Sequence, residues 1–434
     1  MRANSETLTE NVTSKANWPL ALCAGLLGIG QNGLLVMLPQ LVNLTGLSLS
    51  VWAGLLMFGS MLFLPASPWW GRQSERRGCK VVMVASLSGY LASFAVMAVV
   101  VWAMAAGLLQ SSWGLAGLIF SRLLYGLTVS GMVPAAQTWA IQRAGLDKRM
   151  AALATISSGL SCGRLLGPPL AALMLSINPV APLWLMAIAP FIALLLVLRE
   201  VADPPLPPVA HQATRLQVSM LPFLLLAMLL AALVSLMQLG LTPHLSPLLE
   251  GNAREISHHV ALLLSLAALA TLAAQFLIVR PQHFSPLTLL CMAAVSMVAG
   301  LGLMCIAGLA LFYVGIAVTS LGAAMATPGY QLLLNDRLTT GKGAGAIATS
   351  HTLGYGVSAL LVPVVTRFFG EQYLTMAAGG MAVLIFRTEH RGTVNRAHPC
   401  RKKLMYLVRG RADRLILTQT LKRILLIKLG KTLP

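Results

Sequence analysis

The sequence predicts an all-α membrane protein with twelve helices, arranged as two halves of six. Of its 434 residues, 57% are hydrophobic and only 10% are charged, whereas soluble domains carry about 25% charged residues. The hydrophobic residues fall into runs close to the length of about 20 residues that a bilayer crossing needs. A proline-rich break at 203–208 leaves six such runs on each side. The low charge also excludes a disordered chain.

The predicted crossings follow one another with short polar connections. Those of the first half are expected at 18–38, 51–70, 81–106, 114–136, 150–175 and 182–198, and those of the second at 220–241, 260–279, 287–306, 311–334, 344–366 and 373–386. Prolines have no amide N–H, so the break suits a solvated, extended linker. We therefore expect an N-terminal segment at 1–17, helical bundles at 18–199 and 217–386, a linker at 200–216 and a basic tail at 387–434.

The net charge of +19 is distributed as in a membrane protein and not as in a nucleic-acid-binding one. With the N-terminus in the cytoplasm, twelve Lys and Arg fall in the short inside loops. The outside loops hold only Arg254 and Arg367. Inside loops of membrane proteins carry such an excess of positive charge. This asymmetry predicts that both termini are cytoplasmic and that the protein lies in a bacterial-type inner membrane.

The two predicted halves share a faint internal repeat. Pro134 and Gln137 in the fourth run correspond to Pro328 and Gln331 in the tenth, at a spacing close to half the chain. Duplicated halves with a binding site between them near the middle of the membrane are typical of secondary transporters. The repeat therefore indicates a transporter, although Pro and Gln matches in apolar helices also arise by chance.

The connection between the second and third runs, residues 71–80, has a distinctive composition. Gly71 and Gly78 would allow a tight turn between closely packed helices. Glu75 could cap a helix or pair with Arg76 or with a basic group on a neighbouring span, while Lys80 stays in the cytosol. The alternative is an ordinary basic inside loop.

Two arginines lie within the predicted spans, Arg122 in the fourth and Arg164 in the fifth. An arginine at the centre of a span costs about 2.5–3.5 kcal/mol on insertion scales, so each is expected to face a polar interior. Together they predict a cationic cavity for an anionic small molecule. Further polar groups could line that cavity or simply bond a neighbouring helix: Gln31, Asn32, Gln137, Gln238, Gln331, His351 and Tyr355.

The fifth run also contains a row of small residues. Gly159, Gly163 and Gly167 recur every four positions and would form one smooth helix face for close packing, and Pro168 would introduce a kink. Such a row can equally be a general packing seam with no bearing on the direction of transport.

These motifs together resemble the major facilitator superfamily, over about residues 18–386. The segment 71–80 is similar to its G-x-x-x-[DE]-R-x-G-x-K signature, with Glu75 for the usual Asp and Cys79 for the usual basic residue. Arg122 and Gly126 are similar to its R-x-x-x-G motif, and 163–168 resembles its antiporter-type G-x-x-x-G-P motif. The resemblance implies alternating access, a gating role for 71–80, and export in the manner of drug/proton antiporters.

Within that superfamily the whole chain resembles exporters encoded with aerobactin-type siderophore gene clusters. A citrate–hydroxamate siderophore is polyanionic, in agreement with Arg122 and Arg164. Many proton-coupled relatives carry an acid in the first or fourth span, where this chain has Gln31 and Asn32. For the coupling ion, H⁺ by resemblance, His351 is the titratable candidate that remains within a span, and the alternative is that it is a hydrogen-bonded packing residue.

The sequence thus predicts a secondary transporter that exports a small anion such as this siderophore. A multidrug efflux transporter is the first alternative, and a non-transporting membrane sensor or assembly partner is the second. We expect a monomer in the lipid bilayer, with no enzyme activity, cofactor, metal or nucleic-acid partner. The tail at 387–434 has thirteen Lys/Arg against two Asp/Glu, and the twelfth run before it is short. We hypothesise that a shifted reading frame or a truncation replaced the rest of the twelfth crossing, which resequencing the 3′ end of the gene would test.

Overall fold

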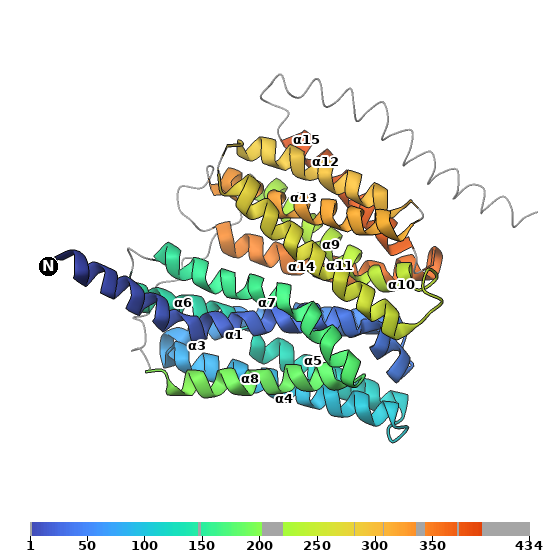
Figure 1. Ribbon diagram of the computed structural model, residues 1–434, viewed down its shortest axis with the longest axis horizontal. Coiled ribbons are helices and arrows are strands. Elements are labelled where there is room, and N and C mark those ends of the chain that lie inside the picture. The colour runs from blue at the N-terminus through green and yellow to red at the C-terminus, as the bar shows by residue number, and fades with distance from the viewer. Residues whose placement is uncertain are drawn as a thin grey trace, which may run out of the picture. The chain divides into compact units, whose positions relative to one another are not determined.

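The computed structural model describes residues 2–145, 149–201, 220–281, 283–306, 308–335, 343–370 and 373–392. All regular elements in these ranges are helices (Figure 1). The chain divides into two compact units, residues 1–385 and 386–434. Most of the predicted linker and all of the tail beyond residue 392 lie outside the described residues.

We call α1–α8 the first half and α9–α14 the second half. The first half comprises α1 (Arg2–Thr45), α2 (Leu49–Met61), α3 (Phe63–Arg77), α4 (Cys79–Ala105), α5 (Ser111–Val129), α6 (Met132–Ala144), α7 (Arg149–Ile177) and α8 (Ala181–Arg199). The second half comprises α9 (Leu221–Leu239), α10 (Leu241–Leu245), α11 (Ala253–Ala274), the π-helix η3 (Gln275–Val279), α12 (Pro286–Met304), α13 (Leu309–Asn335) and α14 (Gly343–Phe368). A last helix, α15 (Leu374–Gly392), follows.

The first ten predicted crossings each coincide with a helical segment long and apolar enough to cross a membrane. In chain order these segments are Asn17–Thr45, Leu49–Arg77, Cys79–Ala105, Ser111–Ala144, Ala151–Ile177, Ala181–Arg199, Leu221–Leu245, Ala253–Val279, Pro286–Met304 and Leu309–Leu334. In their described residues, α14 and α15 do not meet the same criterion. The all-helical fold is confirmed, and the count of twelve crossings stays a prediction.

Three of these segments are broken into two helices, each break lying just before a proline. The breaks fall at Leu62, at Ser130–Gly131 and at Gly240, and the prolines that follow are Pro65, Pro134 and Pro243. A proline has no N–H to donate, and its ring clashes with the carbonyl oxygen four residues earlier. Each helix therefore breaks close to the carbonyl group with which the proline ring would clash.

The break between α5 and α6 is stabilised by side chains from two other helices. The indole Nε1 of Trp70 in α3 donates to the carbonyl oxygen of Leu127 at 2.6 Å. The hydroxyl of Ser86 in α4 donates to the carbonyl oxygen of Thr128 at 2.9 Å. Two carbonyl groups at the break are therefore satisfied from outside the helix.

The glycine row of the fifth crossing packs against α1, and α1 and α7 lie side by side (Figure 1). A Cβ added at Gly159 would lie 2.1 Å from the carbonyl oxygen of Ala21, and one at Gly163 would lie 1.9 Å from that of Gly25. At Gly167 the nearest backbone atoms, those of Ile29, would be 2.9 Å away. Glycine thus lets the backbones of α1 and α7 come into contact. Helix α7 continues unbroken through Pro168.

Candidate functional site

The two halves meet at the end of unit 1 where α1 ends and α2 begins, which we call the Thr45 end. There Arg254 of α11 donates through Nη2 to the carbonyl oxygen of Ser176 in the last turn of α7 at 3.0 Å. The hydroxyls of Ser50 in α2 and Thr366 in α14 lie 3.1 Å apart. Both hydrogen bonds therefore cross from one half to the other.

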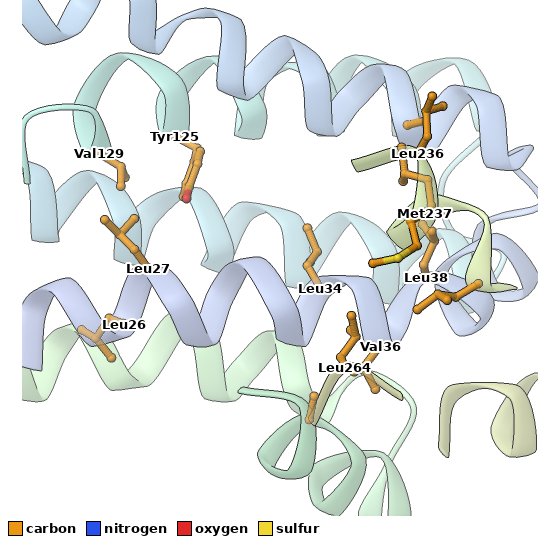
Figure 2. Packing of buried hydrophobic residues seen from close by; sticks show 14 of the residues in the cluster. Leu26, Leu27, Leu34, Val36, Leu38, Tyr125, Val129, Leu236, Met237 and Leu264 are labelled. Carbon is orange, nitrogen blue, oxygen red and sulfur yellow. The ribbon is translucent and has the colours of Figure 1, made fainter. Parts of the chain in front are cut away.

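Apolar side chains from both halves share one buried cluster, which extends to this end. Figure 2 shows Leu34, Val36 and Leu38 of α1 in that cluster together with Leu236 and Met237 of α9 and Leu264 of α11. Each of these six side chains is almost completely buried. Tight apolar packing of this kind excludes water from the junction.

A polar group that we call the central cluster lies further along the spans and takes residues from both halves. It consists of Asn32, Arg164, Tyr330, His351 and Tyr355. The Asn32 amide donates to the backbone carbonyl oxygen of Arg164 at 2.8 Å, which joins α1 to α7 and leaves the guanidinium free for other partners. Arg164 of α7 is exposed within its span.

The second-half side of the cluster is an aromatic and imidazole group. The hydroxyl of Tyr330 in α13 is hydrogen-bonded to Nε2 of His351, and the two rings meet edge to face, with centroids 6.1 Å apart. Tyr330 is fully buried, His351 is half-buried, and Tyr355, one turn beyond His351, is 38% exposed. The buried Tyr330 thus orients the imidazole ring of His351, which is partly accessible.

Arg122, the other predicted cationic residue, lies in an aromatic environment. Its guanidinium is 5.2 Å from the ring centroid of Phe94 and 5.0 Å from that of Tyr125, and Nη2 is 3.3 Å from the Met97 sulfur. The side chain is only 4% exposed, and among the described residues its Nε has no hydrogen-bond partner. The prediction that Arg122 faces polar groups is thus wrong, because aromatic rings lie against its guanidinium instead.

The remaining predicted polar residues are not brought together by any hydrogen bond that we can assign. Gln31 is exposed, and Gln137, Gln238 and Gln331 are half-buried in α6, α9 and α13. Their contribution to a binding site stays a prediction.

The segment 71–80 is not the loop that the sequence predicts. Gly71, Glu75 and Arg76 all lie in α3, which runs to Arg77, and α4 begins at Cys79. Only Gly78 makes the turn, with a φ of 87° that favours glycine. Gly71 is helical, with open space where its Cβ would be, so it makes no turn.

Lys80 connects this turn to the end of the first half. Its Nζ donates to the carbonyl oxygens of Leu198 at 2.9 Å and Glu200 at 2.6 Å, where α8 ends. A cation there complements the negative end of the helix dipole. Arg143 of α6 forms a salt bridge with Glu200 at 3.0 Å. The turn, α6 and α8 are thereby joined into one network.

Sequence reasoning missed Tyr330 and the aromatic residues around Arg122. Tyr330 lies between Pro328 and Gln331, in the repeat that pointed to this part of the chain. A buried tyrosine beside a repeated proline could have been singled out on that ground. Phe94 comes from a different span, and nothing in its own sequence neighbourhood indicates Arg122 as its partner.

We expect a disulfide at the Thr45 end to lock the two halves. In a background without the six native cysteines, Ser50→Cys with Thr366→Cys should cross-link under mild oxidation, because the native hydroxyls lie 3.1 Å apart. Counting free thiols and assaying transport before and after reduction would test this. Each single cysteine variant is the control. Full transport by fully cross-linked protein would show that these ends need not separate.

The comparisons with known proteins place this architecture among membrane transporters. The family model of the Major Facilitator Superfamily matches residues 20–359, more than half of the chain. The chain belongs to this superfamily.

Several curated relatives align with part of the chain. It is 35% identical over 162 residues to the multidrug resistance protein MdtG of Citrobacter koseri, which is 35% of this chain and 37% of that protein. It is 28% identical over 169 residues to MdtG of Proteus mirabilis, which is 38% of this chain and 39% of that protein. The chain thus matches less than two fifths of the length of these relatives.

Solved structures show the same fold at low identity. The nucleoside transporter NupG (D323A mutant) superposes with a TM-score of 0.67 at 13% identity, over 87% of this chain and 100% of that one. A D-xylose–proton symporter gives 0.66 at 14% identity, over 86% and 98%. A bacterial homologue of the iron transporter ferroportin, in an inward-facing state, gives 0.64 at 16%, over 88% and 99%. At these identities the three superpositions show a shared fold.

Proposed function

We propose that this protein is an efflux transporter of the multidrug type, which moves small organic molecules out of the cell by alternating access. One observation carries the proposal. Each half carries polar groups within otherwise apolar spans, Asn32 with Arg164 in the first and Tyr330 with His351 in the second, and the halves are joined by hydrogen bonds and apolar packing at the Thr45 end.

The arrangement suits alternating access. A site shared between two halves is bound by both at once, so a rocking motion of one half against the other can expose it to either side. With the Thr45 end closed, the accessible side would be the opposite end, where α3 ends at Arg77. The basic side chains of that end, by the positive-inside rule, would place it in the cytoplasm.

The direction of transport is supported by similarity. The curated relatives are named as multidrug resistance proteins, and the glycine row of α7 resembles the antiporter-type motif of the superfamily. Both favour export.

Export of a citrate–hydroxamate siderophore is a second candidate, favoured by Arg164. The carboxylates within the described spans are those of Glu75 and Glu255, and each lies in a terminal turn of its span. The central cluster itself holds a guanidinium and no carboxylate, so an anionic substrate would be attracted to it and a cation repelled.

The test is an export assay in a bacterial strain whose major efflux systems have been deleted. Intracellular accumulation of cationic, neutral and anionic compounds would be compared with and without the gene, and the same strain would carry a citrate–hydroxamate siderophore pathway. We expect the gene to lower accumulation of at least one compound. A correctly inserted protein that changes none would overturn export and favour a non-transporting role.

A further inference from the structure

We propose that His351 carries the coupling proton of this transporter, and that an aromatic compound bound on Tyr355, one helical turn away, displaces that proton. The two then cross the membrane in opposite directions. The inference rests on the proposed function, because it names the coupling ion and its carrier for the same transport. The observation that carries it is a histidine on the inward face of its helix, hydrogen-bonded to a buried tyrosine of a neighbouring helix.

His351 lies well inside its helix, unlike the carboxylates and the other histidines of the described spans. It is the ninth residue of the 26-residue helix α14. The carboxylates of the described spans are in terminal turns, and His244, His258 and His259 lie within two turns of the Thr45 end of their spans. An unperturbed histidine changes its charge close to about pH 6.5. His351 is therefore suited to take up and release a proton within the membrane.

His351 and Tyr355 point into the protein interior and not towards lipid. The face of α14 that meets lipid is marked by its exposed apolar side chains Leu353, Leu360 and Val364. Nine residues make about two and a half helical turns, so residues nine positions apart lie on opposite faces. His351 precedes Leu360 by nine positions, and Tyr355 precedes Val364 by the same number. The exposed surface of Tyr355 is therefore accessible from inside the bundle.

The hydrogen bond of His351 tolerates both of its protonation states. Its Nε2 is bonded to the hydroxyl of Tyr330 in α13, which is fully buried. A hydroxyl donates to a neutral imidazole nitrogen or accepts from a protonated one, so this bond survives the gain of a proton. One N–H bond forms when the proton arrives from water, and the same bond breaks when the proton returns to water. Tyr330 thus keeps the ring in one orientation in both states.

A compound bound on Tyr355 removes water from His351, because the two side chains are neighbours on one face of α14. The accessible ring of Tyr355 offers an aromatic surface on which a flat organic molecule can stack. Burial under an apolar molecule disfavours the charged form of an imidazole, so binding expels the proton. By linkage the proton weakens binding of the compound by the same factor. Such mutual exclusion is what an exchange of compound for proton requires.

The other titratable groups around His351 are few. On α14 they are Tyr355 and, at the far end, Arg367, and on α13 they are Tyr330 and the distant Tyr313. Helices α2 and α9, which pack against α14, contain no titratable side chain. Helix α3 also touches α14, and its charged residues Arg72, Glu75, Arg76 and Arg77 lie in its last two turns.

Arg164 of α7 is a further charged group that points away from lipid. It is exposed, and it lies nine positions before the exposed Leu173, on the opposite face of α7. Its charge is permanent between pH 5 and 8, so it does not itself exchange a proton in this range.

The experiment uses the full chain in lipid nanodiscs and has two readouts. The first is the ¹⁵N NMR signal of histidine-labelled protein between pH 5 and 8, in which His351→Gln identifies the resonances of His351 among the eight histidines. The second is the release of protons into weakly buffered solution when Nile red is added, measured together with the Kd of this dye. Nile red is aromatic, fluorescent and uncharged over this range. Empty nanodiscs correct for dye that enters the lipid.

Three further variants separate the roles of the side chains. Tyr355→Leu removes the ring on which the compound stacks, and Tyr330→Phe removes the hydroxyl but keeps the ring. His258→Gln is the matched control, because His258 is an exposed histidine near the start of α11.

We expect the His351 resonances of wild type to change from neutral to protonated between pH 8 and 5. Nile red should release protons at mildly acidic pH and bind up to about tenfold more weakly for each pH unit on the acid side, as displacement of one proton requires. His351→Gln should bind the dye without proton release or pH dependence. A merely structural role would instead weaken binding and leave its pH dependence in place.

The remaining variants should differ from His351→Gln in defined ways. Tyr355→Leu should weaken binding while His351 still titrates. Tyr330→Phe should change the pH at which His351 titrates, because the hydroxyl that bonds its Nε2 is lost. His258→Gln should match wild type in proton release and in Kd.

Two results would overturn the inference. One is a His351 signal that stays in one protonation state from pH 5 to 8, and the other is a dye-induced proton release that is absent in wild type or persists in His351→Gln. Either could occur in a protein that still exports compounds from cells, in which case the proposed function would stand. A protein that exports nothing would instead overturn the proposed function.

Discussion

Replacing Gly163 with alanine will force α1 and α7 apart and destabilise the protein. The added Cβ would lie 1.9 Å from the carbonyl oxygen of Gly25 and 2.6 and 2.8 Å from its carbonyl carbon and Cα. An ordinary carbon–oxygen contact between helices is about 3.3–3.6 Å. All three atoms belong to the backbone, so no side chain can rotate away, and one helix must shift. We expect a fall of several degrees in the melting temperature of the purified protein and a reduced amount in the membrane.

The same packing predicts an order among the three glycines and provides a control. Gly163→Ala and Gly159→Ala should be the most damaging, and Gly167→Ala milder, since its Cβ would be 2.9 Å from backbone atoms of Ile29. Gly54→Ala is the matched control, because Gly54 is also helical and its Cβ would meet nothing within 4 Å. Equal melting temperatures for Gly163→Ala and Gly54→Ala would show that α1 and α7 do not pack as described.

Replacing Arg122 with methionine will raise thermal stability and abolish transport. A buried cation without a carboxylate partner costs several kcal/mol to desolvate, and stacking on aromatic faces returns about 2 kcal/mol. Methionine is unbranched, apolar and flexible enough to fill the space between Phe94 and Tyr125. The motif in which Arg122 lies predicts a functional role, so the stability gained should be accompanied by lost activity.

Thermal unfolding and transport of Arg122→Met would be measured side by side. Arg143→Met is the matched control, because Arg143 has the carboxylate partner Glu200 at 3.0 Å and stacks on Trp139. Its removal should lower the melting temperature. A lower melting temperature for Arg122→Met would assign Arg122 a structural role, and retained transport would exclude it from the transport mechanism.

The long helices were predictable from sequence because lipid demands an unbroken apolar stretch, and composition alone reveals one. The positions at which these helices break were not predictable from sequence. Pro134 is preceded by a break, whereas Pro168 and Pro328 lie inside the continuous helices α7 and α13. The proline rule is the same in all three cases. At the α5–α6 break the difference is that Trp70 and Ser86 satisfy the exposed carbonyl groups, and these partners come from other helices.

The candidate site shows the same limit. Sequence can rank polar residues by their depth in a span, and by that measure Arg164 lies deeper than Gln137 and Gln238. Only the fold brings Asn32 to the backbone of Arg164, which is 132 positions further along the chain. Gly71 was misassigned for a related reason. Glycine suggests a turn, but α3 extends past the membrane-spanning residues, so the turn comes at Gly78.

The break between α5 and α6 is held by hydrogen bonds from Trp70 of α3 and Ser86 of α4, which tie these four helices together. We therefore expect this part of the first half to move as one rigid body. The hydrogen bonds that such a motion would break lie at the contact with the second half, between Arg254 and Ser176 and between Ser50 and Thr366. Changes at this contact should alter how fast the protein turns over, whereas loss of the hydrogen bonds from Trp70 or Ser86 should make the first half flexible at the α5–α6 break.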